Sequence, residues 1–258
     1  MARSFTDQMK REVKIEFTPQ KIISLVPSQT ELLWELGLEK EVVGITRFCI
    51  HPEQWFKSKV RVGGTKKINI DKVKNLEPDL IIANKEENTR EDIEALEKIA
   101  PVWISDVNTL QDAQSMIHQI GLITDREKEA EGLLEEISHA FSTIQKSKRS
   151  VLYFIWKDPH FVAGKHTFID AMLSEAGYTN CCQLDRYPSL EEIGTTQPDL
   201  IFLSTEPFPF NEQHVQEFQI RFPESEIHLV DGEMFSWYGS RLKEVPAYFN
   251  SLLNKLSR

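Results

Sequence analysis

The chain has 258 residues, of which 40% are hydrophobic and 27% are charged, a composition typical of a globular protein. Its 40 acidic residues outnumber its 30 basic residues, and the net charge of −10 argues against a nucleic-acid-binding surface and against adhesion to anionic lipid. No apolar run approaches the roughly 20 residues of a membrane-spanning helix. The N-terminal segment lacks the apolar core of a signal peptide, so we expect a cytoplasmic location if this N-terminus is native.

In the first half, short apolar segments alternate with segments of helical periodicity. Ser28 and Glu31 have the spacing of a capping box, at the start of a helix that ends at Gly37. Strands are expected at 21–26, 41–46, 79–83 and 101–106, and helices at 28–37, 69–78 and 89–100. This alternation, with short connections, predicts a parallel sheet covered by helices.

The second half follows the same order. Strands are expected at 151–156, 199–204 and 226–231, and helices at 167–177, 189–198 and 211–222. The segment EPDLIIANKEE at 77–87 returns as QPDLIFLSTEP at 197–207. PDLI on its own is also a common way to begin a buried strand after a helix, but the matching order of elements favours two lobes of similar plan.

A charged segment between the halves has apolar residues spaced for one helix face. Thr124 and Glu127 have the spacing of a second capping box, and a backbone helix is expected at about 125–146. The expected domains are an N-terminal α/β lobe at 1–108, a helical segment at 109–148 and a C-terminal α/β lobe at 149–258. The predicted fold class is α/β, with two Rossmann-like lobes of mostly parallel strands joined by one long helix and a ligand cleft between the lobes.

Aromatic residues gather in the loops that follow the predicted strands. They are Phe48, Trp156, Phe161, Tyr187, Phe235 and Trp237. Any one of them is more readily explained by core packing. Together, and beside Pro, Gly, Asp and His rather than on a periodic face, they predict an aromatic-walled cleft for a large, flat or partly apolar ligand.

No motif of a catalytic or nucleotide-binding site is present: the chain has no GxSxG, GxGxxG or HExxH. Enzymatic activity is therefore not expected. His51, His160 and His166 lie in predicted loops, and with Asp231 they are the candidate ligands of a metal ion. Cys49 shares a loop with His51, but a small buried hydrophobic role explains it equally well.

The chain resembles the class III, helical-backbone substrate-binding proteins of ABC importers, which bind iron chelates, haem and cobalamin. The resemblance covers about residues 5 to 250 and is carried by IISLVPSQTELLWELGLEKEVVGIT, RVGGTKKINIDKVKNLEPDLIIA, FIWKDPHFVAGKHTFIDAMLSEAG and LIFLSTEPFPF. The cobalamin-binding branch is the most similar. The resemblance implies an extracytoplasmic protein, expected to be a monomer, that captures a corrinoid and delivers it to an ABC permease.

The same resemblance implies the site residues. The ligand-binding candidates are Pro27, Phe48, His51, Trp156, Phe161, Tyr187, Glu233, Phe235 and Trp237. Asn84 stands where better-known relatives carry a tryptophan. One acid in each lobe is expected to dock on the permease, Glu86 and Glu206, with Glu91 and Glu212 as nearby competitors.

Two alternatives stay open at this point. The first is a receptor of the same fold for haem, an iron siderophore or a bare metal ion. The second is a cytoplasmic enzyme or sensor built on the same scaffold, for which the sequence offers no nucleophile and base.

Overall fold

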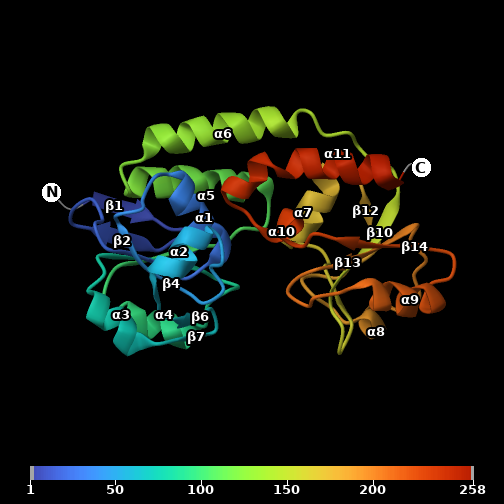
Figure 1. The fold of residues 1–258 in the computed structure, drawn as a ribbon, viewed down its shortest axis with the longest axis horizontal. Coiled ribbons are helices and arrows are strands. Elements are labelled where there is room, and N and C mark those ends of the chain that lie inside the picture. The colour runs from blue at the N-terminus through green and yellow to red at the C-terminus, as the bar shows by residue number, and fades with distance from the viewer. Residues whose placement is uncertain (1–2, 257–258) are drawn as a thin grey trace. The chain divides into compact units, whose positions relative to one another are not determined.

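A computed structural model describes residues 3–256 (Figure 1). The described chain divides into two compact units. Unit 1 consists of the residues up to Val107, Gln111–Ile137 and Tyr238–Arg241. Unit 2 consists of Asn108–Leu110, Ser138–Trp237 and the residues from Leu242 onward.

Between Arg3 and Phe141, strands and helices largely alternate after an initial hairpin. In chain order they are β1 (Arg3–Thr6), β2 (Glu12–Ile15), β3 (Ile22–Ser24), α1 (Pro27–Glu35), β4 (Val42–Ile45), α2 (Glu53–Ser58), β5 (Val60–Arg61), β6 (Gly63–Gly64), β7 (Lys67–Ile68), α3 (Ile70–Leu76), β8 (Leu80–Asn84), α4 (Arg90–Leu96), β9 (Val102–Ser105), α5 (Leu110–Ile123) and α6 (Glu127–Phe141).

The core of unit 1 is a five-stranded sheet in the order β5-β4-β3-β8-β9, and every neighbouring pair in it is parallel. The central strands β3 and β8 are buried along their whole length, which explains why they read as continuous apolar runs. The hairpin β1–β2 forms a separate two-stranded sheet, which sequence reasoning did not anticipate.

Unit 2 repeats the alternation on a smaller scale. Its elements are β10 (Ser150–Trp156), β11 (Phe161–Val162), α7 (Phe168–Glu175), β12 (Thr179–Asn180), α8 (Leu190–Ile193), β13 (Leu200–Ser204), α9 (Glu212–Arg221), β14 (Glu226–Val230), α10 (Glu233–Ser236) and α11 (Val245–Leu256), with the 3₁₀ turn η1 (Ser240–Lys243) before α11. The sheet order is β11-β10-β13-β14, with β12 also paired to β10, and only the β10–β11 pair is antiparallel.

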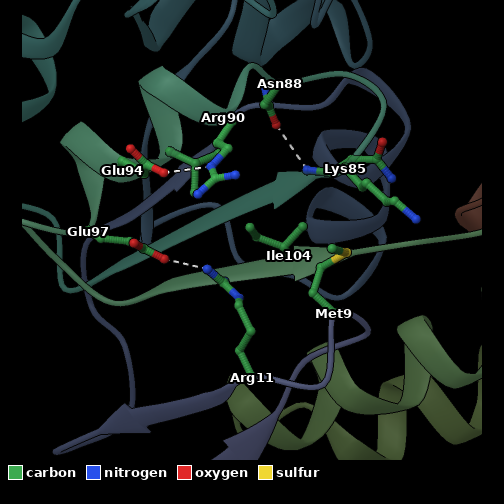
Figure 2. Close-up of a pocket in the computed structure, with 10 residues that line it drawn as sticks. Met9, Arg11, Lys85, Asn88, Arg90, Glu94, Glu97 and Ile104 are labelled. Carbon is green, nitrogen blue, oxygen red and sulfur yellow. Dashed lines mark hydrogen bonds and ion pairs between the residues drawn. The ribbon is translucent and has the colours of Figure 1, made fainter.

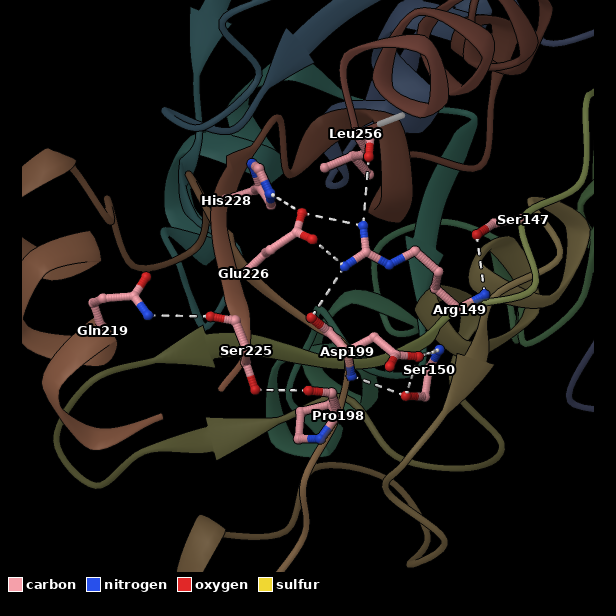
Figure 3. A network of polar contacts seen from close by, with 10 residues as sticks. All are labelled: Ser147, Arg149, Ser150, Pro198, Asp199, Gln219, Ser225, Glu226, His228 and Leu256. Atoms are coloured by element: carbon pink, nitrogen blue, oxygen red, sulfur yellow. Dashed lines mark hydrogen bonds and ion pairs between the residues drawn. The ribbon is translucent and has the colours of Figure 1, made fainter. Parts of the chain in front are cut away.

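The aspartate of the repeated PDLI segment has the same task in both units. Asp79 accepts hydrogen bonds from the backbone N–H groups of Gln20 and Lys21, at 2.8 and 3.0 Å, just before β3. Asp199 accepts from the backbone N–H and the hydroxyl of Ser150, both at 2.7 Å, at the start of β10 (Figure 3). Each aspartate thus ties the start of its own strand to the start of the neighbouring strand, which explains why the phrase occurs twice.

Glycine ends the first long helix of each sheet, as expected. Gly37 follows α1 with φ +74°, and Gly177 follows α7 with φ +81°. This left-handed conformation costs little only for glycine. At Gly177 a side chain would also meet the backbone of Ser147, because an added Cβ would lie 2.6 Å from its carbonyl oxygen.

Both predicted capping boxes are wrong. The start of α1 has no side-chain cap, and Glu31 instead forms an ion pair with Arg241, at 2.6 and 3.0 Å. Thr124 lies at the end of α5, where its hydroxyl donates to the carbonyl of Ile120 at 2.7 Å. Glu31 is engaged by a residue that is distant in the sequence, whereas Thr124 is engaged by the last turn of the preceding helix.

The expected backbone helix at 125–146 is shorter in the structure, because α6 ends at Phe141. Beyond it the hydroxyls of Ser142 and Thr143 donate to the carbonyls three residues back, at 2.6 and 2.7 Å. Such local bonds compete with helix continuation. The predicted apolar face is confirmed, since Ala130, Leu133 and Ile137 are buried.

Among residues 3–256, no helix combines the length and the apolar character needed to cross a membrane.

Replacing Asp199 by asparagine should lower the free energy of unfolding at pH 7 by roughly 0.5–1 kcal/mol, because this carboxylate is largely exposed and a neutral acceptor bonds more weakly. The N–H and hydroxyl of Ser150 hold the pKa of Asp199 below its ordinary value. A lowered pKa stabilises the fold above the unfolded pKa, and this stability is lost as the pH falls through the folded pKa. The difference in the free energy of unfolding between the wild type and Asp199→Asn, measured by urea unfolding, should therefore shrink in acid.

The matched control is Glu224→Gln, which also removes one exposed carboxylate from unit 2. This variant should match the wild type at every pH. If Asp199→Asn unfolds with the wild type at pH 7, the aspartate does not hold the two strands together.

Candidate functional site

The ends of the parallel strands define where a ligand site is expected in each unit. In open parallel sheets, ligands bind beyond the carboxyl ends of the strands. In unit 1 this edge carries the loops after β3, β4 and β8, and in unit 2 it carries the loops after β10, β13 and β14. We call these loops the carboxyl edge of each unit and describe the two edges separately.

The carboxyl edge of unit 2 contains a pocket of about 430 Å³. It is formed where β13 and β14 end, and it is lined by Thr205, Glu206, Leu229, Val230, Asp231 and Glu233. Two of these acids, Glu233 and Asp231, belong to the residues predicted to bind a ligand or a metal ion, and a third, Glu206, was predicted to dock on a permease. The structure therefore brings three predicted acids together around one pocket.

Glu206 is half-buried in this pocket and is engaged by the next loop. Its Oε1 accepts hydrogen bonds from the hydroxyl of Ser236 at 2.8 Å and from the indole Nε1 of Trp237 at 3.0 Å. Burial raises the pKa of Glu206, and the neighbouring Glu233 and Asp231 act in the same direction, against the two hydrogen bonds.

The loop after β14 is held by backbone hydrogen bonds. The N–H of Asp231 donates to the hydroxyl of Tyr248 at 2.8 Å, and the N–H of Gly232 donates to the hydroxyl of Thr205 at 3.1 Å. Gly232 fits because it has no side chain, since an added Cβ would lie 2.5 Å from Cγ of Glu206. The position of Glu206 is thus set by close packing as well as by hydrogen bonds.

The predicted aromatic residues after β10 form a surface. Trp156 is 40% exposed and packs edge-to-face on half-buried Phe208, with ring centroids 5.7 Å apart. Phe161 lies opposite Trp156 in the β10–β11 pair, and it also bridges to Ser189, two residues after Tyr187. The sequence pointed to Trp156, Phe161 and Tyr187, but it missed Phe208.

Two aromatic residues after β14 lie deeper. Phe235 has no exposed surface and packs among Tyr153, Phe202 and Phe249, at centroid distances of 5.1, 6.1 and 4.8 Å. It is a core residue of unit 2, so the ring has no free face to offer a ligand. Trp237 is 7% exposed, and its indole is oriented by the bond to Glu206.

At the carboxyl edge of unit 1, Phe48 is the most exposed of the predicted residues, at 47%. The guanidinium of Arg47 lies over its ring, 4.9 Å from the centroid. The predicted residues Pro27 and His51 are half-buried in the neighbouring loops. Cys49, between Phe48 and His51, is buried against the hydroxyls of Thr30 and Thr46, and burial raises the pKa of its thiol.

Asn84 is buried, and its side chain holds the loop after β8 by hydrogen bonds instead of forming part of an exposed wall. Its Oδ1 accepts from the N–H groups of Glu86 and Glu87, at 2.8 and 3.1 Å, and its Nδ2 donates to the hydroxyl of Ser105 at 3.0 Å. Its own N–H donates to Asn88, at 2.9 Å. This position therefore shapes the loop that carries Glu86.

The candidate metal ligands are dispersed. His160 packs edge-on against Phe154 and Phe218, and burial lowers its pKa. His166 is exposed, with its Nε2 3.6 Å from a carboxylate oxygen of Asp185. Within residues 3–256, no three His, Cys, Asp or Glu side chains are grouped so that they could hold a metal ion.

The predicted docking acids differ in exposure from their competitors. Glu86 and Glu206 are half-buried, whereas Glu91 and Glu212 are exposed in the first turns of α4 and α9. The ammonium group of Lys66 donates to the backbone carbonyl of Glu86, which fixes that loop further.

A second pocket, of about 410 Å³, lies in unit 1 beside the turn after β1 (Figure 2). Ile104 and Met9 supply apolar surface, and the ion pairs Arg11–Glu97 and Arg90–Glu94 flank it. Its described lining includes none of the predicted ligand-binding residues, and these charged groups are already paired with one another.

Replacing Asn84 by leucine should lower the free energy of unfolding by about 2–4 kcal/mol, because two backbone N–H groups and the Ser105 hydroxyl would lose buried partners. Asn84→Asp should also destabilise the fold, because its carboxylate still accepts from the two N–H groups but places a buried oxygen against the Ser105 carbonyl to which Nδ2 now donates. Urea unfolding of both variants tests the prediction. A leucine variant as stable as the wild type would show that the loop does not depend on Asn84.

Comparison with known proteins places this arrangement in a family. A family model described as periplasmic binding protein matches residues 22–224, which leaves the β1–β2 hairpin outside the match. An ABC transporter substrate-binding lipoprotein, YvrC of Bacillus subtilis (strain 168), is 34% identical over 183 residues. That match covers 65% of this chain and 57% of YvrC, so the chain spans less than two thirds of this relative's length.

The vitamin B12-binding protein of Vibrio campbellii (strain ATCC BAA-1116) is 25% identical over 72% of this chain and 70% of its own length. The crystal structure of the petrobactin-binding protein YclQ from Bacillus subtilis has the same fold, with a TM-score of 0.80 over 97% of this chain and 98% of YclQ, at 21% identity. The fold is therefore the α/β fold of the helical-backbone binding proteins. Because the family model spans well over half of the sequence, the chain belongs to the periplasmic binding protein family.

Proposed function

We propose that this protein is the solute-binding component of an ABC importer and that its ligand is a corrinoid similar to cobalamin. The observation that carries the proposal is the aromatic surface of Trp156 and Phe208 at the carboxyl edge of unit 2. Flat ring faces of this kind suit a large ligand with an apolar face. The similarity to a vitamin B12-binding protein over 72% of the chain supports the same choice.

The acid-lined pocket beside this surface also suits a corrinoid. Asp231 and Glu233 offer hydrogen-bond acceptors, and amide side groups around a ring supply donors. Carboxylate acceptors would disfavour a ligand whose own rim is anionic, because burying like charges together is costly. Glu233 is the acid that we expect to contact the ligand.

A second candidate ligand is an anionic metal chelate such as a ferric siderophore or haem. Two guanidinium groups favour it: Arg47 lies over Phe48 in unit 1, and Arg186 lies over Tyr187 in unit 2, 5.5 Å from the centroid. Arginine beside an aromatic ring is a common way to bind carboxylate or catecholate oxygens on a flat ligand.

The proposal implies an extracytoplasmic protein that exchanges ligand with a permease and catalyses no reaction. The relative YvrC is named as a substrate-binding lipoprotein of an ABC transporter, which is consistent with that setting. Glu86 and Glu206 are the proposed contacts to the permease, one from each unit.

Isothermal titration with cyanocobalamin should show saturable binding of one ligand per chain. Parallel titrations with haemin, a ferric catecholate siderophore and Zn²⁺ distinguish the alternatives. Tight binding of the ferric catecholate or haemin, with no heat from cobalamin, would replace the corrinoid by the anionic chelate. Binding of Zn²⁺ alone would contradict both candidates.

Removing the exposed indole should weaken the binding of cobalamin. A ring face stacked on a flat ligand contributes roughly 1–3 kcal/mol, so Trp156→Ala should raise the Kd about tenfold to a hundredfold. Ile220→Ala is the matched control, because Ile220 is an exposed apolar residue of unit 2 that lies near the end of helix α9. Equal affinities in the two variants would remove Trp156 from the binding surface.

The docking role is tested with a double variant, Glu86→Gln with Glu206→Gln. Each substitution removes a negative charge and keeps a side chain that can accept hydrogen bonds. Surface charge pairs mainly speed encounter, so the double variant should associate with its ABC permease severalfold more slowly and with less dependence on salt. Glu91→Gln with Glu212→Gln is the matched comparison. If only the double variant at Glu91 and Glu212 slows docking, these exposed acids of α4 and α9 are the contacts instead.

A further inference from the structure

Glu206 joins two segments of unit 2 that are distant in the sequence. It follows β13, whereas both of its hydrogen-bond donors, Ser236 and Trp237, lie where α10 ends. Both bonds reach the same oxygen, Oε1, at 2.8 and 3.0 Å. Among the residues that the structure describes, neither of these donors reaches Oε2, and Glu206 lines the pocket.

The turn that carries these donors is held at its start by hydrogen bonds of Asp231 and Gly232. The N–H of Glu233, the first residue of the four-residue helix α10, donates to Oδ1 of Asp231 at 3.0 Å. Phe235 secures one side of this helix in the core of unit 2. On the other side, the indole of Trp237 is held by the carboxylate of Glu206.

Glu206 itself has little freedom to move. The backbone of Gly232 packs against its Cγ, where an added Cβ would come within 2.5 Å. Its own backbone is fixed as well, because the hydroxyl of Ser204 donates to its carbonyl at 2.5 Å. A rigid acceptor of this kind is what keeps a bulky side chain in a single orientation.

We propose that Glu206 is a positioning residue of the carboxyl edge of unit 2, which holds the indole of Trp237 and the turn carrying Glu233 in place for the ligand. The position of the indole follows from the contacts alone, whereas its consequence for binding rests on the proposed function. This role is separate from docking, because it requires the acceptor oxygen and not the negative charge.

Two variants separate the acceptor from the charge. Glu206→Gln keeps an oxygen that can accept from Trp237, and Glu206→Met keeps a similar length but has no such acceptor. Trp237→Phe removes the indole and identifies its signal among the five tryptophans in the NMR spectrum of the full-length, ¹⁵N-labelled protein.

The first measurement is the chemical shift and solvent exchange of the Trp237 indole N–H without ligand. Glu206→Met should speed exchange at least tenfold, and Glu206→Gln should restore it to within about threefold of the wild type. A Met variant that exchanges like the wild type, or a Gln variant that exchanges like Met, overturns the proposal. If Glu206→Met does not fold, Glu206→Gln alone decides. Loss of a charged acceptor must change the chemical shift of the Trp237 indole proton, so an unchanged chemical shift overturns the proposal.

The second measurement is the Kd for cyanocobalamin of the same variants. Glu206→Met should weaken binding about tenfold, and Glu206→Gln should stay within threefold of the wild type. Equal affinity in Glu206→Met despite a released indole would show that this positioning does not serve binding. A wild type that binds no cobalamin contradicts the proposed ligand, while the exchange measurement still decides whether Glu206 positions Trp237.

Discussion

Parallel pairing of the strands is the constraint on which the rest of this structure depends. Each parallel connection must carry the chain back along the sheet, so the strand starts collect at one edge and the strand ends at the other. The starts are fixed by Asp79 and Asp199, whose carboxylates tie neighbouring strands together. The strand ends lead into loops that carry Phe48 and Glu206, and Trp156 is the last residue of β10. The aspartates that tie the strands together thereby lie at one edge of each sheet, and the proposed binding residues lie at the other edge.

The sequence predicted the strands and the repeated plan well because those signals are local. Apolar runs, PDLI and the helix-ending Gly37 and Gly177 act within a few residues, and the structure confirms them. The first capping box failed for the opposite reason. Glu31 has the right spacing for a cap, but its partner is Arg241, 210 residues away, and no local pattern reveals that competition. The early end of α6 depends similarly on hydroxyl bonds that periodicity does not register.

The sequence placed the candidate site residues at strand ends, but it did not predict how deeply each of them is buried. Trp156 and Phe235 both lie in aromatic loops at strand ends, yet one is 40% exposed and the other has no exposed surface. The difference comes from Tyr153, Phe202 and Phe249, which surround Phe235 only once the chain is folded. In the same way, Asn84 is fixed in the core by its bonds to the following loop. Phe208 was missed because its importance comes from contact with Trp156.

The charge of the unit 2 edge follows from how Glu206 is held. Burial and the nearby Asp231 and Glu233 raise its pKa, while the hydroxyl of Ser236 and the indole of Trp237 favour the ionised form. A raised pKa means that Glu206 loses its negative charge at a higher pH than an ordinary exposed glutamate does. Under the proposed function, a corrinoid would lose at most a little affinity as this charge is lost, because a neutral oxygen of Glu206 still accepts from the indole of Trp237. An anionic chelate drawn to Arg186 would gain affinity as the pH falls, so the direction of the pH dependence distinguishes the two ligand classes.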